Sequence, residues 1–143
     1  MDSIRKQAEI FWDINQEINS VYEEYARSVG LSYTSLFTLH IIAWTENCTQ
    51  KYIAEQMFLP KQTIHSVVTA ICRQGLVEYR EVSEDRRHKT LHLTEKGREY
   101  AGRILSRMED AEVCGIAQFS REERSLFLQM MRRYTNAFSA ALR

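Results

Sequence analysis

Residues 49–75, TQKYIAEQMFLPKQTIHSVVTAICRQG, and residues 76–97, LVEYREVSEDRRHKTLHLTEKG, decide the fold of this chain. The first stretch predicts two short helices. Thr49 can accept a hydrogen bond from a free backbone N–H of a first helical turn, which makes it a good N-cap. Pro60 breaks the apolar pattern and suits the first turn of a following helix. Gly75 is a suitable C-terminal cap. Two helices joined by so short a turn indicate a helix-turn-helix.

The second stretch predicts a β-hairpin. Val77 and Tyr79 alternate as the packed residues of a first strand, and Leu91 and Leu93 alternate in a second. Between them, residues 83–89 are polar or charged, as the tip of a hairpin is. A helix and a charged hairpin side by side can contact two adjacent grooves of duplex DNA, so the two stretches together predict a winged helix-turn-helix.

The polar residues of the second helix and of the hairpin tip are the candidates for contacting DNA. Ile64, Val67, Val68 and Ile71 recur on the inward face of the helix. That leaves short polar or cationic groups near its start, where the base edges of a major groove are reached. In the tip, Asp85 is interpreted as a brace that accepts hydrogen bonds and frees the neighbouring cations. The predicted DNA-contacting residues are Thr49, Lys61, Gln62, Thr63, His65, Ser66, Thr69, Arg73, Asp85, Arg86, Arg87 and Lys89.

The hairpin also carries a resemblance to a known family. The run Asp85-x-Arg87, followed by Leu93-Thr94 and Gly97, is similar to the wing signature of the MarR family of winged-helix transcriptional regulators. The matching motif covers about a third of the chain, and the helices on either side fit the order of the family.

The resemblance implies a homodimer that binds double-stranded DNA at a pseudo-palindromic operator, usually as a repressor. It also implies release by a small ligand or by thiol oxidation. By the same resemblance, Arg87 would enter the minor groove and residues 61–66 would face the major groove. Many members have a Thr-Arg pair where this chain has His65-Ser66, and this departure indicates a different operator sequence.

Long amphipathic helices are predicted on both sides of the winged region. Residues 4–28 repeat apolar side chains at seven-residue intervals, and the helix after the capping box Ser120–Glu123 repeats them at spacings of four and three. We expect these helices to pack against the same helices of a second chain, and packing within one chain is the alternative. We therefore expect a mainly α fold with a small β-hairpin wing, as a single MarR-like domain over 1–143, with the winged helix-turn-helix at 32–98 and dimerisation helices at 1–30 and 99–143.

The charge distribution fits a DNA-binding protein although the formal net charge is zero. Residues 49–98 hold nine Lys/Arg against six Asp/Glu, whereas residues 1–48 hold three against seven. The positive excess therefore falls on the winged region. It is modest, so we expect weak non-specific binding and a dependence on base contacts and dimerisation, because phosphate neutralisation drives non-specific affinity.

Several classes of protein are disfavoured by the sequence. No apolar run approaches the roughly 20 residues of a membrane span, and no signal-peptide pattern is present, so no membrane partner is expected. Three distant cysteines favour a reducing cytoplasm. No glycine-rich phosphate loop, metal-ligand cluster or nucleophile motif indicates an enzyme. His88 and His92 alone are too weak a signal for a metal site. No cofactor is expected.

Regulation could involve a ligand or a thiol. The resemblance to the MarR family implies a ligand pocket between the dimerising helices and the winged domain. The aromatic residues expected near that junction are Trp12, Tyr33, Phe37, His40 and Trp44, with a small aromatic or phenolic anion as the ligand class. Thiol-based redox sensing is an alternative, carried by Cys48, Cys72 or Cys114. Cys48 is expected to be the more accessible thiol because it precedes a helix cap in a loop. A winged-helix protein-interaction module without DNA binding is the other alternative.

Overall fold

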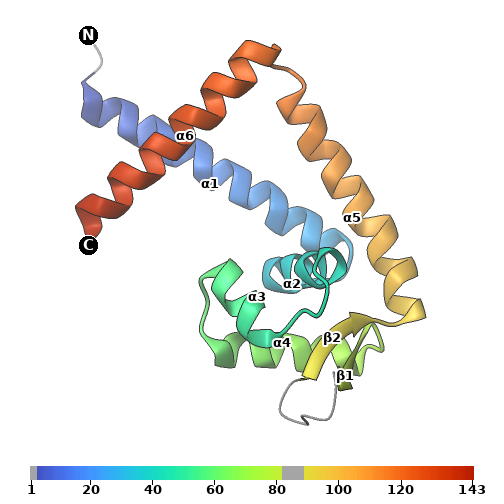
Figure 1. Cartoon of the computed structure of the whole chain (residues 1–143). Helices are drawn as coiled ribbons and strands as arrows, with labels where there is room; N and C mark the ends of the chain where they lie inside the picture. The colour runs from blue at the N-terminus through green and yellow to red at the C-terminus, as the bar shows by residue number, and fades with distance from the viewer. Residues whose placement is uncertain (1–2, 82–88) are drawn as a thin grey trace. The chain divides into compact units, whose positions relative to one another are not determined.

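The computed structural model describes residues 3–81 and 89–143 and forms two compact units, Met1–Ile104 and Leu105–Arg143. The elements, labelled in Figure 1, are α1 (Ile4–Ser28), α2 (Tyr33–Trp44), α3 (Gln50–Met57), α4 (Lys61–Arg73), β1 (Val77–Glu81), β2 (Lys89–Leu93), α5 (Glu95–Ile116) and α6 (Arg121–Leu142). The expected mainly α fold with a two-stranded hairpin is confirmed. Helix α5 begins in the first unit and continues into the second.

Short polar side chains start most of the helices, as expected from the sequence. Ser32 accepts a hydrogen bond from the backbone N–H of Ser35, and Thr49 accepts one from Tyr52, so α2 and α3 are both capped. Phe58 adopts a left-handed backbone with φ of 54°, which ends α3 and leads into Pro60 and α4. These local signals set the boundaries of the helix-turn-helix.

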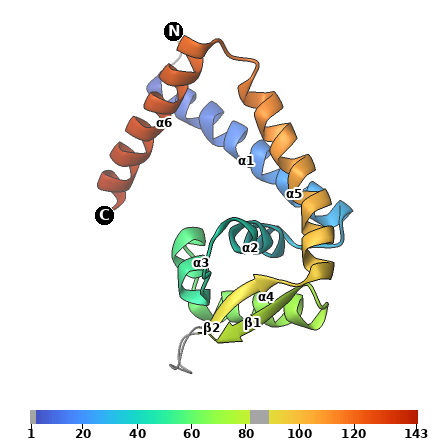
Figure 2. The ribbon, with the colours of Figure 1, turned by 45° about the vertical axis from the view of Figure 1, so that its right-hand side comes forward.

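The core of the first unit lies where α2, α3 and α4 meet. Leu36 and Leu39 on α2, Ile53 on α3, and Ile64 and Ile71 on α4 are all almost completely buried. Figures 1 and 2 show α3 and α4 crossing beside α2, with the hairpin next to α4. The apolar pattern of α2 predicts that Ala43 also faces inward, and this is wrong, because α2 is exposed at that position.

The hairpin pairs in an antiparallel register that sets Tyr79 opposite Leu91. Leu91 is buried, and its N–H donates to the carbonyl of Cys48 at 2.7 Å, so the segment before α3 adds an isolated bridge to β2. This bridge buries Cys48 completely, and the expectation of an accessible thiol there is wrong. The expectation that Val77 packs is confirmed, but Tyr79 stays 41% exposed.

One junction ties the end of α4, the base of the hairpin and the start of α5. The Thr94 hydroxyl donates to the carbonyl of Gly75 at 2.5 Å and accepts from the N–H of Gly97 at 2.9 Å. The N–H of Thr94 donates to the carbonyl of Leu76 at 3.1 Å. A Cβ on Gly97 would lie 1.8 Å from that carbonyl oxygen, so only glycine fits. Gly75 has a φ of 76°, as expected of a residue that follows a helix.

Two side chains fasten α1 to α5 within the first unit. The Tyr25 hydroxyl donates to the carbonyl of Ile104 at 2.7 Å, and the Tyr100 hydroxyl donates to the carbonyl of Val29 at 2.5 Å. Burial raises the pKa of Tyr100, partly offset by nearby Arg103, so its hydroxyl keeps the proton that it donates.

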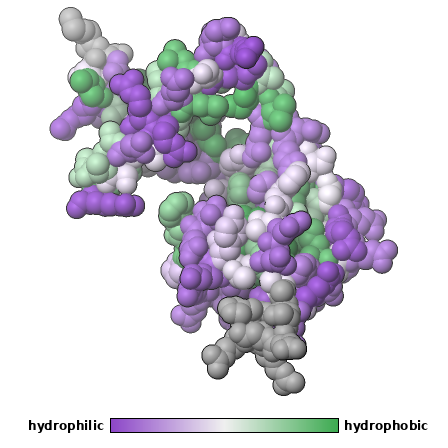
Figure 3. Space-filling model, in the orientation of Figure 1, coloured by the Kyte–Doolittle hydropathy of each residue, from purple (hydrophilic) through white to green (hydrophobic). Residues whose placement is uncertain are grey.

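Apolar side chains remain open along α1 and α6. Ile14 and Ile18 on α1 are each 50% exposed, and α6 has no buried residue. Figure 3 shows hydrophobic side chains at the surface along these helices. In the second unit, the capping box at Ser120 and Glu123 starts α6 as expected. None of the helices within the described ranges is apolar over a length that would cross a bilayer.

The close approach at Gly97 gives a direct test of the junction. Gly97→Ala should lower the free energy of unfolding by about 3 kcal/mol or more, the upper end of what overpacking costs, because the new methyl group meets backbone that cannot move alone. The matched control is Gly102→Ala in the same helix, where no atom lies within 4 Å of the added Cβ. There alanine should stabilise by about 0.5–1 kcal/mol. Equal effects of the two substitutions in urea unfolding would contradict this packing.

Candidate nucleic-acid interface

Helix α4 presents a polar face to the surface. Gln62, Ser66, Thr69 and Arg73 follow one another at spacings of four, three and four, which places them on one side of a helix. Gln62, Ser66 and Arg73 are exposed and Thr69 is half-buried, whereas Ile64 on the opposite side is fully buried. The helix can therefore lie in a groove with this stripe against the bases while its apolar side stays in the core.

The first turn of α4 is open to an anion. Its N-cap is Pro60, which makes no side-chain capping hydrogen bond, so the free N–H groups of the first turn are not satisfied by a cap. Lys61, Gln62 and Thr63 are exposed in that turn. The positive end of the helix dipole and the Lys61 ammonium group together favour a phosphate oxygen at this point.

Three of the candidate hydroxyl groups already make hydrogen bonds within the protein. Ser66 donates to the carbonyl of Gln62 at 3.1 Å, and Thr69 donates to the carbonyl of His65 at 2.8 Å. Thr49 accepts from the backbone as the cap of α3. While these bonds hold, Ser66 and Thr69 can only accept further hydrogen bonds, so they suit the amino groups of adenine or cytosine and not phosphate oxygens.

A series of side-chain contacts links the two helices to the hairpin. The side-chain amide of Gln50, in the first turn of α3, lies 3.3 Å from Nδ1 of His65 on α4. The same amide donates through Nε2 to the hydroxyl of Tyr79 on β1. Desolvation raises the pKa of Tyr79, only partly offset by the Gln50 bond, so the hydroxyl is neutral at physiological pH. Gln50 and Tyr79 were not among the predicted site residues.

The hairpin is described only up to the base of its tip. Lys89 begins β2 and is exposed, and it pairs across the hairpin with Glu81 in the backbone register. The predicted contacts Asp85, Arg86 and Arg87 lie outside the described residues. On β1, Arg80 forms an ion pair with Glu78, with 2.9 Å between Nη2 and Oε1.

Comparison with known proteins agrees with this geometry. Residues 29–88 match the model of the MarR family. A curated relative, the HTH-type transcriptional repressor YetL of Bacillus subtilis (strain 168), is 25% identical over 122 residues, 84% of this chain and 73% of the relative. These comparisons support a regulator of the MarR family. The chain is a DNA-binding transcription regulator.

Solved structures show how far the likeness to the MarR family extends. The MarR family regulator NMB1585 from Neisseria meningitidis superposes with a TM-score of 0.79 at 26% identity, covering 95% of this chain and 96% of that one. FabT of Streptococcus pneumoniae, solved in complex with DNA, gives a TM-score of 0.80 at 22% identity, covering 99% and 100% of the two chains. The fold of a MarR family protein therefore extends over nearly the whole chain.

The aromatic residues expected to form a ligand pocket are partly brought together. Tyr33, Phe37, His40 and Trp44 line one hollow beside α2, closed on the other side by α3. The rings of Tyr33 and Phe37 lie 4.7 Å apart between centroids. Trp12 does not line this hollow and is 62% exposed on α1.

The three thiols of the chain differ sharply in environment. Cys48 is buried, and burial raises its pKa to about 11. Cys72 on α4 is half-buried, and burial raises its pKa as well. Cys114 is exposed. A reactive thiol needs a lowered pKa and access to solvent, so Cys48 and Cys72 are poorly suited to redox sensing. Within the described ranges, no group of three His, Cys, Asp or Glu side chains is arranged to hold a metal ion.

The burial of Cys48 predicts slow thiol chemistry. With a pKa of about 11, only about one thiol in a thousand is ionised at pH 8. In a Cys72→Ser, Cys114→Ser variant, Cys48 should remain unlabelled by iodoacetamide at pH 8 over the time in which the same protein, unfolded in guanidinium, is fully labelled. Mass spectrometry measures both rates. Equal rates in the folded and unfolded protein would mean that the thiol is accessible.

Proposed function

We propose that this MarR family protein is a sequence-specific repressor that binds a pseudo-palindromic operator as a homodimer. In each half-site α4 would lie in the major groove and the hairpin wing against the neighbouring minor groove. The observation that supports this most is the exposed polar stripe on α4, which begins at an uncapped first turn and is linked to β1 through Gln50. Its relatives are transcription regulators, and we propose no enzymatic activity.

The proposed contacts divide by their chemistry. Gln62, His65 and Ser66 would face base edges, because they are polar and lie in the first half of α4, and Thr69 continues the same exposed side about one turn further. Lys61 would neutralise a phosphate at the helix start, and Arg73 would reach backbone near the other end. In the wing, we propose that Arg87 enters the minor groove, where a guanidinium group suits the narrow and electronegative surface. Asp85, Arg86 and Lys89 complete the proposed wing contacts, with Thr49 and Thr63 at the helix starts.

Homodimerisation through the terminal helices follows from their surface. Apolar side chains at Ile14, Ile18, Leu126 and Phe138 are each at least half exposed in the single chain. Covering the exposed half of such a side chain contributes about 1 kcal/mol, roughly half of what burying a fully exposed one does, which favours a second chain covering them. A twofold dimer would then set two α4 helices about 34 Å apart, one turn of DNA.

Release by a small ligand is the regulatory part of the proposal. The aromatic side chains of Tyr33, Phe37, His40 and Trp44 around one hollow support an aromatic body for the ligand. We propose an apolar or phenolic anion as its class. A ligand that binds better to a dimer with a different α4 spacing would lower operator affinity by that difference. Thiol oxidation is the less favoured route, because the buried thiols are poor nucleophiles.

Phosphate and base contacts can be separated by their salt dependence. Lys61→Gln should weaken binding to operator and random DNA alike, and should reduce the salt slope of log K by roughly two per dimer, one phosphate contact per chain. Gln62→Ala should weaken operator binding by about 1–3 kcal/mol while leaving random DNA and the salt slope unchanged. Fluorescence anisotropy at several salt concentrations measures both effects.

The control for both variants is Lys6→Gln, which makes the same charge change on α1, where Lys6 pairs with Glu9. It should bind as the wild type does. If a wild-type protein binds selected and random DNA equally at physiological salt, the proposal of sequence-specific binding is wrong. A protein-interaction module without DNA binding would bind neither DNA.

Two substitutions on α1 test the proposed dimer. Ile18→Asp should make the protein monomeric in sedimentation at micromolar concentration, because a charge cannot be buried unpaired at an apolar interface, and operator affinity should fall with it. Glu17→Gln on the same helix should stay dimeric. A wild-type protein that is monomeric at this concentration would contradict the dimer.

A further inference from the structure

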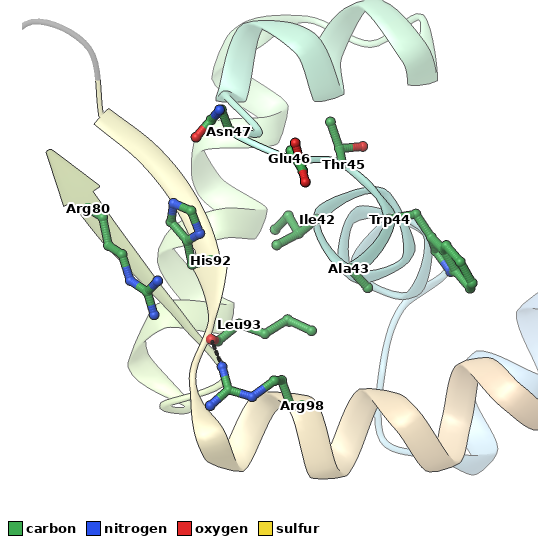
Figure 4. A pocket seen from close by; sticks show the side chains of 10 residues that line it. All are labelled: Ile42, Ala43, Trp44, Thr45, Glu46, Asn47, Arg80, His92, Leu93 and Arg98. Atoms are coloured by element: carbon green, nitrogen blue, oxygen red, sulfur yellow. Dashed lines mark hydrogen bonds between the residues drawn. The ribbon is translucent and has the colours of Figure 1, made fainter. Parts of the chain in front are cut away.

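A cluster of three side chains lies where α3, α4 and the hairpin meet. Gln50, in the first turn of α3, is half-buried, and its amide nitrogen Nε2 donates to the hydroxyl of Tyr79 on β1. Tyr79 and Arg80 are successive residues of a strand and therefore point to opposite faces of the hairpin. Arg80 lines a hollow between α2 and the hairpin together with Ile42 and His92 (Figure 4), whereas Tyr79 lies against Gln50. The cluster is therefore separate from that hollow.

The amide of Gln50 also contacts the ring of His65 on α4, the third member of the cluster. Nε2 and Oε1 of Gln50 each lie 3.3 Å from Nδ1 of His65. A primary amide has two N–H donors and a carbonyl oxygen, so the bond to Tyr79 leaves one donor and the acceptor for this ring. The carbonyl of His65 accepts from the Thr69 hydroxyl at 2.8 Å. This exposed residue is therefore held both at its ring and at its backbone.

The contact through Nδ1 leaves Nε2 as the ring nitrogen of His65 that can meet DNA. Within residues 3–81 and 89–143, Nε2 has no hydrogen-bond partner. When Nδ1 carries no proton, the remaining N–H of Gln50 can donate to it, and when both ring nitrogens carry one, Oε1 can accept from Nδ1. Nε2 is a donor in both states. The third state, with its one proton on Nδ1, would turn a lone pair toward the negatively charged duplex, which disfavours it.

A donor at this point of α4 selects among the four bases. In the major groove guanine presents two acceptors, O6 and N7, whereas adenine presents one acceptor beside an amino donor. Cytosine presents an amino donor, and thymine presents one acceptor beside a methyl group. Ser66 and Thr69 use their hydroxyl protons within the protein and suit amino groups. A donor from His65 adds the complementary preference, and guanine suits it best.

We propose that Gln50 is a positioning residue for base recognition, which holds His65 through Nδ1 so that Nε2–H donates to a guanine of the operator. This inference rests on the proposed function, because it takes α4 to lie in the major groove. Gln50 contacts no base itself. It orients the ring before DNA binds, and ordering a free side chain at the interface would otherwise lower the affinity roughly two- to tenfold.

The test is the discrimination of guanine from adenine at the operator position that His65 contacts. In operators selected from a random pool, this is the position at which His65→Ala removes a preference for guanine. Fluorescence anisotropy gives the ratio of affinities for operators that carry guanine or adenine there. The ratio should be roughly tenfold or more for the wild type, the usual effect of one wrong base pair, and close to one for His65→Ala. Gln50→Ala should lower the wild-type ratio roughly threefold or more.

A double variant and a matched control separate positioning from a general loss of structure. Adding Gln50→Ala to His65→Ala should change operator affinity less than about twofold, because the effect of Gln50 runs through the ring. Gln56→Ala, the same substitution at an exposed position of α3, should keep the wild-type ratio. An unchanged ratio in Gln50→Ala, an equal loss of affinity with and without His65, or no guanine preference that depends on His65 overturns the proposal.

Nuclear magnetic resonance of the DNA-free protein measures the cluster independently of operator binding. His65→Ala and Tyr79→Phe should each shift the side-chain N–H resonances of Gln50 more than those of Gln56. If neither substitution shifts the Gln50 resonances, the amide does not hold the ring and the proposal is wrong. If the wild type selects no DNA sequence, the proposed function fails, while these spectra still decide whether Gln50 holds His65.

Discussion

The hydrogen bonds of Thr94 are the constraint on which the DNA-facing surface depends. This one residue accepts from Gly97 at the start of α5, donates to Gly75 at the end of α4, and pairs through its backbone with Leu76 at the base of the hairpin. The absence of a side chain at Gly97 lets α5 approach the Leu76 carbonyl. Helix α4, the hairpin and α5 are therefore joined at a single point, so a displacement of any one of them displaces the other two.

Away from that point, weaker connections hold the wing beside the helices. The contacts of Gln50 with His65 and Tyr79 run across the exposed side of the motif. The bridge from Cys48 to Leu91 runs across its buried side. Net gains from individual hydrogen bonds are about 0.5–1.5 kcal/mol, so these links can adjust at low cost, whereas the Thr94 junction combines three hydrogen bonds with the close approach at Gly97 and costs more to disrupt. A regulator needs both properties, because its response is a difference in affinity between two arrangements.

The sequence predicts what is local and misses what is distant. Helix starts at Ser32, Thr49 and Ser120 follow from capping, which depends only on residues a few positions apart. The buried state of Cys48 depends on β2, far along the chain, so local composition predicts the wrong environment for that thiol. Tyr79 alternates like a core residue, yet its hydroxyl bonds to Gln50 and its ring stays partly exposed.

The polar stripe of α4 can be predicted, because it consists of the residues that remain once the regularly spaced apolar residues of the helix are assigned to the core. The structure places this stripe on the surface. Four residues of the aromatic hollow beside α2 can be predicted, because they all lie on α2 at helical spacing. They are Tyr33, Phe37, His40 and Trp44.

The central claim is that two copies of α4 and its wing are held at a fixed separation that matches one turn of DNA. Selection of bound sequences from a random pool would give the operator, and binding would then be measured to operators whose half-sites are moved apart by about 5 base pairs, half a helical turn. The account predicts that affinity falls to the level of random DNA, because the second half-site turns to the opposite side of the duplex. Unchanged affinity would contradict it.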